Sequence, residues 1–110
     1  MSFLRVLSLL VLIVCSYVSK AQLNIDHAMM VGRNALYFED YVLSIKYFNM
    51  VIGVRPNMSE PYFFRGLAKY NLDDYKGAEA DLTMSIDRNP YVSKSYQLRG
   101  LCRVLMEQYD

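Results

Sequence analysis

The apolar and polar positions of this chain follow two patterns, one before residue 22 and one after it. After Arg5, apolar residues dominate the 13 positions from Val6 to Val18, and the small residues Ser19 and Ala21 follow. This arrangement is typical of a secretory signal peptide that is cut before Gln22. The apolar run is shorter than the roughly 20 residues of a membrane-spanning helix, which favours cleavage over anchoring. Residues 1–21 are therefore predicted to be a signal peptide.

Two further observations bear on the exported chain. Cys15 suggests lipoprotein processing as an alternative, but Val14 is larger than the small residue usual before a lipidated cysteine. Removal of Arg5 and Lys20 leaves ten basic residues against eleven acidic ones, a net charge of −1. No concentrated basic face is present, so a nucleic-acid partner is not expected. We predict a location in the periplasm or cell envelope, with secretion as a further option.

Beyond residue 22 the chain is periodic. Three series of residues recur at a separation of 34 positions, namely Gly32, Gly66 and Gly100, then Tyr41, Tyr75 and Tyr109, then Pro56 and Pro90. A period of this length is typical of stacked helix-turn-helix units, each with a hydrophobic face that it cannot bury alone. The sequence therefore predicts an all-α fold with about two and a half units, at residues 25–58, 59–92 and 93–110.

The recurring residues also predict where the helices lie and how they pack. A glycine inside a helix costs about 1 kcal/mol relative to alanine, so glycines at one phase indicate close approach of a second helix. The expected partner position in that helix carries small residues, Ser44 and Ala78. Tyr41 and Tyr75 follow acidic pairs that suit a helix N-terminus, so each should begin the second helix. The repeated prolines should end it.

The second unit resembles a known family. Its residues from Pro61 to Tyr70, followed by Asp73 to Ala78, resemble the tetratricopeptide repeat (TPR) in its Arg-Gly variant. The resemblance runs from about residue 25 to the end, although the first unit has Ala28 where an aromatic residue is usual and Ser44 where alanine is usual. It implies a right-handed superhelix of antiparallel helix pairs, with a concave groove for a partner peptide or protein.

The same resemblance implies which side chains line the groove. Positions 2, 5, 9, 12 and 13 of the first helices face it in the family. The residues at these positions are Asp26, Met29, Arg33, Leu36 and Tyr37, then Glu60, Phe63, Leu67, Tyr70 and Asn71, then Lys94, Gln97, Leu101, Val104 and Leu105. Of these, Met29, Arg33, Tyr37, Phe63, Tyr70, Asn71 and Gln97 are expected to contact the partner. Chaperone-binding members hold a terminal carboxylate with lysine and asparagine, whereas this chain has Met29 and Arg33 at matching places. We therefore expect a partner with apolar or aromatic anchors. The alternative is that missing repeats or a downstream domain fill the groove.

Two arginines occupy a position that is more often apolar in the family. Arg65 is followed sixteen residues later by Asp81, whereas the equivalent pair in the first unit, Val31 and Tyr47, is neutral. This matching predicts an ion pair between the two helices of the second unit. The equivalent acid for Arg99 would be residue 115, beyond the printed sequence, so Arg99 should be solvated or should borrow Asp81.

The sequence contains little that suggests catalysis. His27 is the single histidine, and no cluster of ligands has metal-site spacing, so neither a metal nor another cofactor is expected. No serine, histidine and acid set has the context of a nucleophile, which predicts a binding protein and not an enzyme. Asn57-Met58-Ser59 fits a glycosylation acceptor, but Ser59 is better explained as a helix N-cap. Cys102 should be buried in helix packing or bonded to a second chain.

The third unit stops at Asp110, before its second helix. Its apolar flank, residues 94–106, then lacks a cover, which predicts self-association or fraying. We expect either a fragment of a longer protein or a second chain on this face. Two functions follow: an exported protein-interaction scaffold, or the N-terminal adaptor of a longer enzyme or signalling protein.

Overall fold

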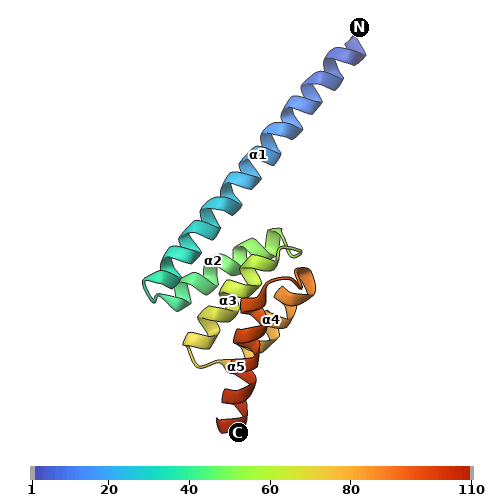
Figure 1. Cartoon of the computed structure of the whole chain (residues 1–110). Helices are drawn as coiled ribbons and strands as arrows, with labels where there is room; N and C mark the ends of the chain where they lie inside the picture. Colours follow the sequence, from blue (N-terminus) through green and yellow to red (C-terminus); the bar gives the residue numbers. More distant parts are fainter. Residues whose placement is uncertain (1, 110) are drawn as a thin grey trace.

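The computed structural model describes residues 2–109, and these form five α-helices. The helices are α1 (Ser2–Tyr37), α2 (Tyr41–Val54), α3 (Ser59–Asn71), α4 (Tyr75–Arg88) and α5 (Ser93–Tyr109). Helix α1 pairs with α2 and α3 pairs with α4, both in antiparallel fashion, and α5 packs against α4 (Figure 1). The predicted all-α array of antiparallel helix pairs is therefore confirmed.

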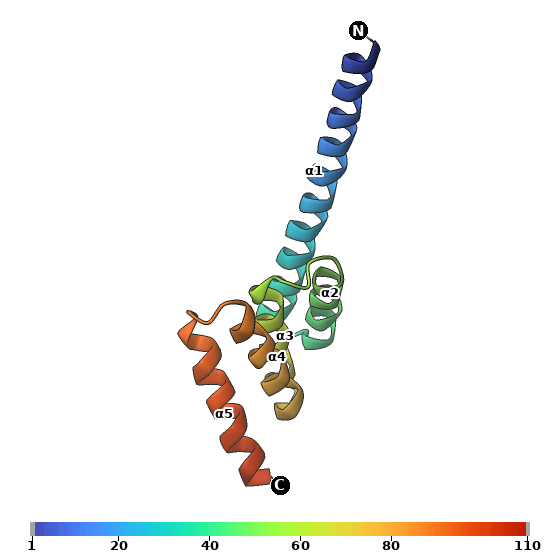
Figure 2. The same cartoon turned by 90° about the vertical axis from the view of Figure 1, so that its right-hand side faces the viewer.

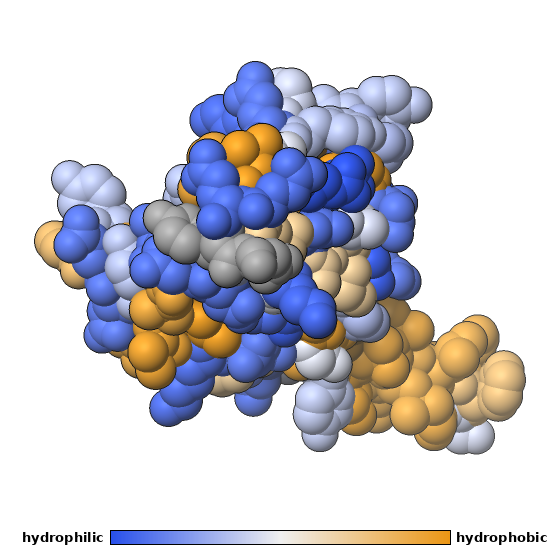
Figure 3. All heavy atoms as spheres, turned by 90° about the horizontal axis from the view of Figure 1, so that it is seen from below, coloured by the Kyte–Doolittle hydropathy of each residue, from blue (hydrophilic) through white to orange (hydrophobic). Residues whose placement is uncertain are grey.

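Helix α1 has two parts with different surroundings. Its last turns, from Ile25 onward, pack against the array, while the segment before residue 20 projects away from it (Figure 2). This projection makes the molecule 71 Å long but only 28 × 19 Å in its other dimensions. In the space-filling view the projecting part is largely apolar, next to a body whose visible face is mostly hydrophilic (Figure 3).

Among the described residues, α1 is long and apolar enough to cross a membrane, and its apolar stretch is exposed. The run from Val6 to Val18 is, by itself, shorter than a membrane-spanning helix. The helix in fact continues without a break through that run, so length alone does not separate a signal sequence from an anchor. A signal sequence near the N-terminus meets the same criterion.

Two similar turns join the helices within each pair. Glu39 and Asp73 each adopt a left-handed φ of 64°, directly after α1 and α3 have ended. Aspartates follow and cap the next helix: Asp40 accepts a hydrogen bond from the Leu43 amide at 3.2 Å, and Asp74 accepts one from the Gly77 amide at 2.9 Å. These contacts satisfy amides that a helix N-terminus leaves unpaired, so α2 and α4 begin at the predicted tyrosines.

The helix ends agree with the repeated prolines, but the expected role of Ser59 was wrong. Helices α2 and α4 each end two residues before Pro56 and Pro90. Ser59 is the first residue of α3 and not its N-cap, and its hydroxyl instead donates to the Ser85 carbonyl at 2.8 Å. That bond ties α3 to the end of α4.

The core consists of two clusters, one in each half of the array. The first contains Ile25, Ala28, Met29, Phe48 and Val51, joined by the half-buried Tyr47, Met58 and Phe64. The second contains Ala78, Leu82 and Cys102, joined by Phe63, Tyr70, Tyr75 and Leu98. Because Cys102 comes from α5 and is fully buried, it holds α5 against α4. Burial, followed by the nearby charge of Glu79, raises the pKa of the Cys102 thiol.

The three repeated glycines differ in what surrounds them. A Cβ atom at Gly32 would lie 2.7 Å from the Phe48 ring, and one at Gly66 would lie 3.3 Å from the Ala78 carbonyl oxygen. Both glycines therefore allow the close approach that was predicted. The partner of Gly32 is Phe48 and not the expected Ser44, which is buried nearby with its hydroxyl bonded to the Tyr41 carbonyl. Gly100 has no atom within 4 Å of such a Cβ.

Candidate peptide-binding hollow and the arginine network

A hollow of about 540 Å³ lies between α1 and the start of α3. We call it the α1–α3 hollow; it is lined by Asp26, Met29, Met30, Arg33, Asn34, Tyr37, Met58 and Glu60. Of the residues predicted to line a groove, it therefore brings Asp26, Met29, Arg33, Tyr37 and Glu60 together. Met29 is almost fully buried and belongs to the first core cluster, whereas 81% of Tyr37 is exposed. The hollow thus has a floor fixed by the core and a rim free to contact a ligand.

The lining of the α1–α3 hollow combines thioethers with a few charges. Met29, Met30 and Met58 supply flexible, polarizable side chains that adapt to differently shaped partners. Arg33 lies over the Phe64 ring, with its guanidinium carbon 5.2 Å from the ring centroid. Arg33 is the single basic side chain of this lining, which also contains the two carboxylates of Asp26 and Glu60.

The other predicted groove residues lie outside this hollow. Phe63 and Tyr70 are half-buried and pack against the second core cluster. The Asn71 side-chain amide donates to the Leu67 carbonyl at 2.8 Å, at the C-terminal end of α3. Gln97 is exposed on α5.

Phase in the first helices did not identify every residue of the hollow. Met30 and Asn34 each lie one position after a predicted groove residue, and Met58 belongs to the turn that precedes α3. The inter-repeat turn contributes to the surface because α3 starts beside α1. A search for methionines near the groove positions would have found Met30 and Met58.

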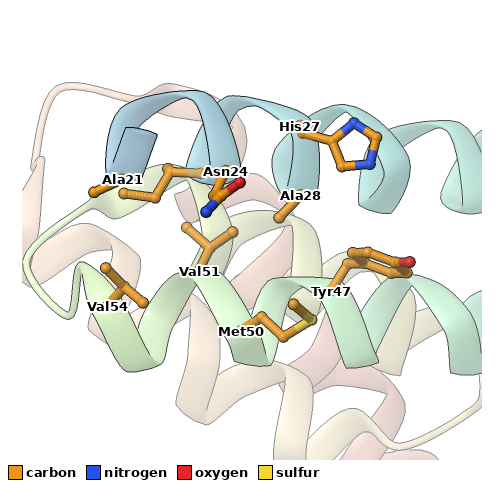
Figure 4. A pocket seen from close by; sticks show the side chains of 9 residues that line it. Ala21, Asn24, His27, Ala28, Tyr47, Met50, Val51 and Val54 are labelled. Atoms are coloured by element: carbon orange, nitrogen blue, oxygen red, sulfur yellow. The ribbon is translucent and has the colours of Figure 1, made fainter. Parts of the chain in front are cut away.

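A second hollow of about 390 Å³ lies between α1 and α2, lined by Ala21, Asn24, Ile25, His27, Ala28, Tyr47, Met50, Val51 and Val54. Figure 4 shows Val51 of α2 pointing toward the side of α1 that carries Asn24 and Ala28. The single histidine lies on its margin. No group of three histidine, cysteine or carboxylate side chains suited to a metal occurs within residues 2–109.

The predicted ion pair between Arg65 and Asp81 is confirmed and belongs to a larger network. Arg65 donates from Nε to Asp81 Oδ2 at 2.8 Å and from Nη2 to Oδ1 at 2.7 Å. The Lys69 Nζ atom lies 3.0 Å from Oδ2. Arg65 Nη1 also donates to Asn49 Oδ1 at 2.9 Å, so the arginine joins α2, α3 and α4. Because the nearly buried Asp81 carboxylate is paired and hydrogen-bonded in this way, the free-energy cost of burying its charge is compensated.

The expectation for Arg99 was wrong in both of its forms. Arg99 is half-buried and does not reach Asp81; its Nη1 instead donates to Thr83 Oγ1 at 3.3 Å. Thr83 holds the same position in the second unit that Asn49 holds in the first, because 34 residues separate them. The rule missed by sequence reasoning is that a position-7 arginine also reaches back to the preceding helix.

Comparison with known proteins supports the fold. No protein-family model matches the chain, and no curated protein matches its sequence. Three solved structures are similar: the TPR2B domain of yeast Sti1 in a complex with pHsp70, the first TPR of Spaghetti (RPAP3) bound to the HSP90 peptide SRMEEVD, and the TPR2AB domain of yeast Sti1 in a complex with pHSP90. Their TM-scores are 0.74, 0.72 and 0.74 at 20%, 19% and 19% sequence identity.

These alignments cover most of the chain. They include 79%, 77% and 86% of it, and 70%, 69% and 39% of the three solved chains, respectively. The similarity shows an all-α helical-repeat fold of the TPR type. In these three relatives the fold binds Hsp70 or Hsp90 partners.

Proposed function

We propose that this protein is an exported protein-interaction scaffold that binds a peptide segment of a partner protein in the α1–α3 hollow. The observation that carries the proposal is the convergence of Met29, Arg33 and Tyr37 with Met58 and Glu60 around one hollow. Solved TPR structures with bound peptides support the use of such a fold for binding. Binding, without catalysis, accounts for the residues that line the hollow.

The charges of the hollow favour a basic and apolar peptide over an acidic one. Asp26 and Glu60 present two carboxylates against the single guanidinium of Arg33, which is already placed over Phe64. Potentials of opposite sign across an interface steer association and suppress wrong partners. The thioethers and the exposed Tyr37 ring would hold an apolar anchor of the peptide. The terminal-carboxylate capture used by chaperone-binding relatives is therefore not proposed for this hollow.

A pair of matched peptides tests this function. Fluorescein-labelled SRMEEVD and its charge-reversed form SRMKKVK would be titrated against the full chain in lipid nanodiscs, with fluorescence anisotropy as the readout and empty nanodiscs as the blank. We expect SRMKKVK to bind at least about fivefold more tightly, since the two carboxylates repel the acidic peptide. Glu60→Lys should reduce the ratio of the Kd of SRMEEVD to the Kd of SRMKKVK, whereas Glu107→Lys, an exposed change on α5, should leave this ratio unchanged. Tighter binding of SRMEEVD, or a preference unaffected by Glu60→Lys, would refute the proposal.

The proposed domain boundaries are a signal peptide at 1–21 and TPR units of the Arg-Gly variant at 25–58, 59–92 and 93–110. Supporting this division, Ile25 is the first buried residue among those whose burial is described, so cleavage after Ala21 removes one lining residue of the hollow between α1 and α2 and leaves the core clusters intact. The role of an adaptor in a longer enzyme or signalling protein stays a prediction.

Export has its own test. Mass spectrometry of protein from the cell envelope should find an N-terminus at Gln22. Ala21→Trp should block cleavage, because the residue before the cut must be small. Full-length protein in the cytoplasm would contradict export, and full-length protein held in the membrane would show that α1 is an anchor.

A further inference from the structure

Helix α5 repeats a four-residue arrangement of α3 at the same phase of the repeat. In α3 the arrangement is Tyr62, Arg65, Gly66 and Lys69, and in α5 it is Tyr96, Arg99, Gly100 and Arg103. Each pair of equivalent residues is separated by 34 positions. The two helices therefore present the same side-chain types at the same spacing.

The two arrangements also make the same supporting contacts. The tyrosine hydroxyls donate to proline carbonyls, Tyr62 to Pro56 at 2.8 Å and Tyr96 to Pro90 at 3.0 Å. The arginines lie over those tyrosine rings, with guanidinium carbons 5.6 and 5.5 Å from the centroids.

Each arginine also donates a hydrogen bond to a residue of the helix before its own. The Nη1 atom donates to the preceding helix, from Arg65 to Asn49 and from Arg99 to Thr83. The Arg99 side chain is thus oriented by two neighbours before any ligand arrives, as Arg65 is.

The two arrangements differ in the helix that covers them: α4 covers the one on α3, and no described helix covers the corresponding side of α5. In α3 the Nε and Nη2 atoms of Arg65 hold the Asp81 carboxylate, with Lys69 beside it, and Gly66 is covered by Ala78, Asp81 and Leu82. Within residues 2–109, the corresponding Nε and Nη2 atoms of Arg99 make no hydrogen bond or ion pair. Gly100 is exposed, with no atom within 4 Å of a Cβ built on it.

The surroundings of Gly100 suit a helix. Leu101 is 43% exposed and Val104 51% exposed, on the turns next to the glycine. Arg103 stands where α3 has its second cation; it is half-exposed and lies 3.5 Å from Glu79, a looser contact than the one between Lys69 and Asp81. An apolar strip with two cations along one edge complements an amphipathic helix that carries a carboxylate.

The described part of α5 follows a different course from α1 and α3. Helices α1 and α3 end before position 15 of their units, where Glu39 and Asp73 turn the chain back at a φ of 64°. Glu107 holds that position in the third unit but lies inside α5, which stays helical through Tyr109. Within the described residues, the third unit therefore has no turn at this position. A second copy would not supply its α4, because Ala78, Asp81 and Leu82 of that helix are already buried.

We propose that the Arg99–Gly100 face of α5 docks an acidic amphipathic helix of a partner polypeptide. That helix presents a small residue and, three and four positions later, a carboxylate and an aliphatic side chain, as α4 presents Ala78, Asp81 and Leu82 to α3. The carboxylate accepts from Nε and Nη2 of Arg99, and the small residue packs on Gly100. This surface is separate from the α1–α3 hollow and does not depend on its function.

Helix α4 itself supplies the probe. A fluorescein-labelled peptide with the sequence of residues 74–90 would be titrated against the full chain in lipid nanodiscs, followed by anisotropy, with empty nanodiscs as the blank. We expect saturable binding. Replacing the peptide's equivalent of Asp81 with asparagine should raise Kd about tenfold or more, because Arg99 then loses its charged partner.

Variants of the protein show where the peptide binds. Gly100→Leu should raise Kd about tenfold or more, because the leucine side chain fills the space over residue 100. Gly53 is an equally open glycine on α2, so Gly53→Leu should leave Kd unchanged. Arg99→Glu should abolish binding of the native peptide and restore it for a peptide with lysine at the Asp81 position. Circular dichroism would confirm that each variant is folded.

Several outcomes would overturn the proposal. They are the absence of binding, binding that Gly100→Leu leaves intact, and binding indifferent to the peptide carboxylate. If the peptide instead displaced the protein's own α4, its Kd would be unchanged by Gly100→Leu, and this result would reveal the exchange. Concentration-dependent self-association by sedimentation that the peptide does not compete away would assign the face to a second copy, against the proposal.

Discussion

Replacing Asp81 with alanine should destabilise the fold more than any change of an exposed acid. The carboxylate is 3% exposed, and its loss would leave the Arg65 guanidinium and the Lys69 ammonium, 18% and 25% exposed, without their shared partner. Removing one side of a buried pair costs about 3–5 kcal/mol. Arg65 would keep its bond to Asn49, and both cations reach water, so we expect the lower end, about 3 kcal/mol.

The assay is thermal unfolding of the full chain followed by circular dichroism. A loss of about 3 kcal/mol corresponds to a fall in Tm of about 12–24 °C for an array of this size. The matched control is Asp87→Ala, an exposed acid on the same helix, which should change stability by about 0.5 kcal/mol or less. A combined change of Arg65→Met and Asp81→Leu should recover much of the loss, because the guanidinium is then removed with its partner and only Lys69, which reaches water, stays unpaired.

Equal shifts for Asp81→Ala and Asp87→Ala would refute the reasoning, since the network would then contribute nothing beyond an exposed charge. A double variant no more stable than Asp81→Ala would show that the loss comes from packing and not from the unpaired cations.

Three further changes test the packing, the caps and the buried thiol. Gly66→Ala should destabilise the fold by about 1 kcal/mol or more, because its Cβ would meet α4 at 3.3 Å, whereas Gly100→Ala, in open space, should stabilise it by up to about 1 kcal/mol. Denaturant unfolding measures both changes in the free energy of unfolding, and changes of the same sign would contradict the glycine argument. Asp74→Ala should cost about 1 kcal/mol through loss of the cap to Gly77, compared by melting with the exposed Lys76→Ala, and equal melts would reject the cap. Cys102 should resist alkylation until the chain unfolds. Because burial raises the pKa of the folded Cys102 thiol, the unfolded thiol ionises first, so stability should fall as the pH rises above the ordinary thiol value, and Cys102→Ala should remove this trend.

The repeat architecture was predictable because it depends on residues that act locally. Glycine, proline and an aspartate before tyrosine each restrict the backbone or cap a helix wherever they occur, so a period of 34 specifies the starts of α2 and α4. The ion pair between Arg65 and Asp81 was also predictable, since charges appeared at both of its positions together. The contact of Arg65 with Asn49 was not, because an amide at that position carries no distinguishing signal in one sequence.

The candidate site was only partly predictable for a physical reason. Phase along a helix gives the direction of a side chain, but exposure depends on what the next helix covers. Phe63 and Tyr70 hold the repeat positions of Met29 and Leu36, 34 residues earlier, yet α4 and α5 bring the second core cluster against them. Met58 lies in a turn, where helical phase says nothing, and still reaches the α1–α3 hollow.

The arginine of the repeat links units as well as helices within a unit. Arg65 bonds back to α2 through Asn49 and forward to α4 through Asp81, so one side chain spans the boundary between the first and second units. Arg99 bonds back to α4 through Thr83 and keeps its forward donors unpaired within the described chain. Neighbouring units of a helical-repeat array stabilise each other mainly through their interfaces, so a helix that supplies a carboxylate to Arg99 should stabilise α5 and, through Thr83, α4. Slower amide exchange in both helices on addition of the residue 74–90 peptide would be the direct sign of that coupling, and protection confined to α5 would contradict it.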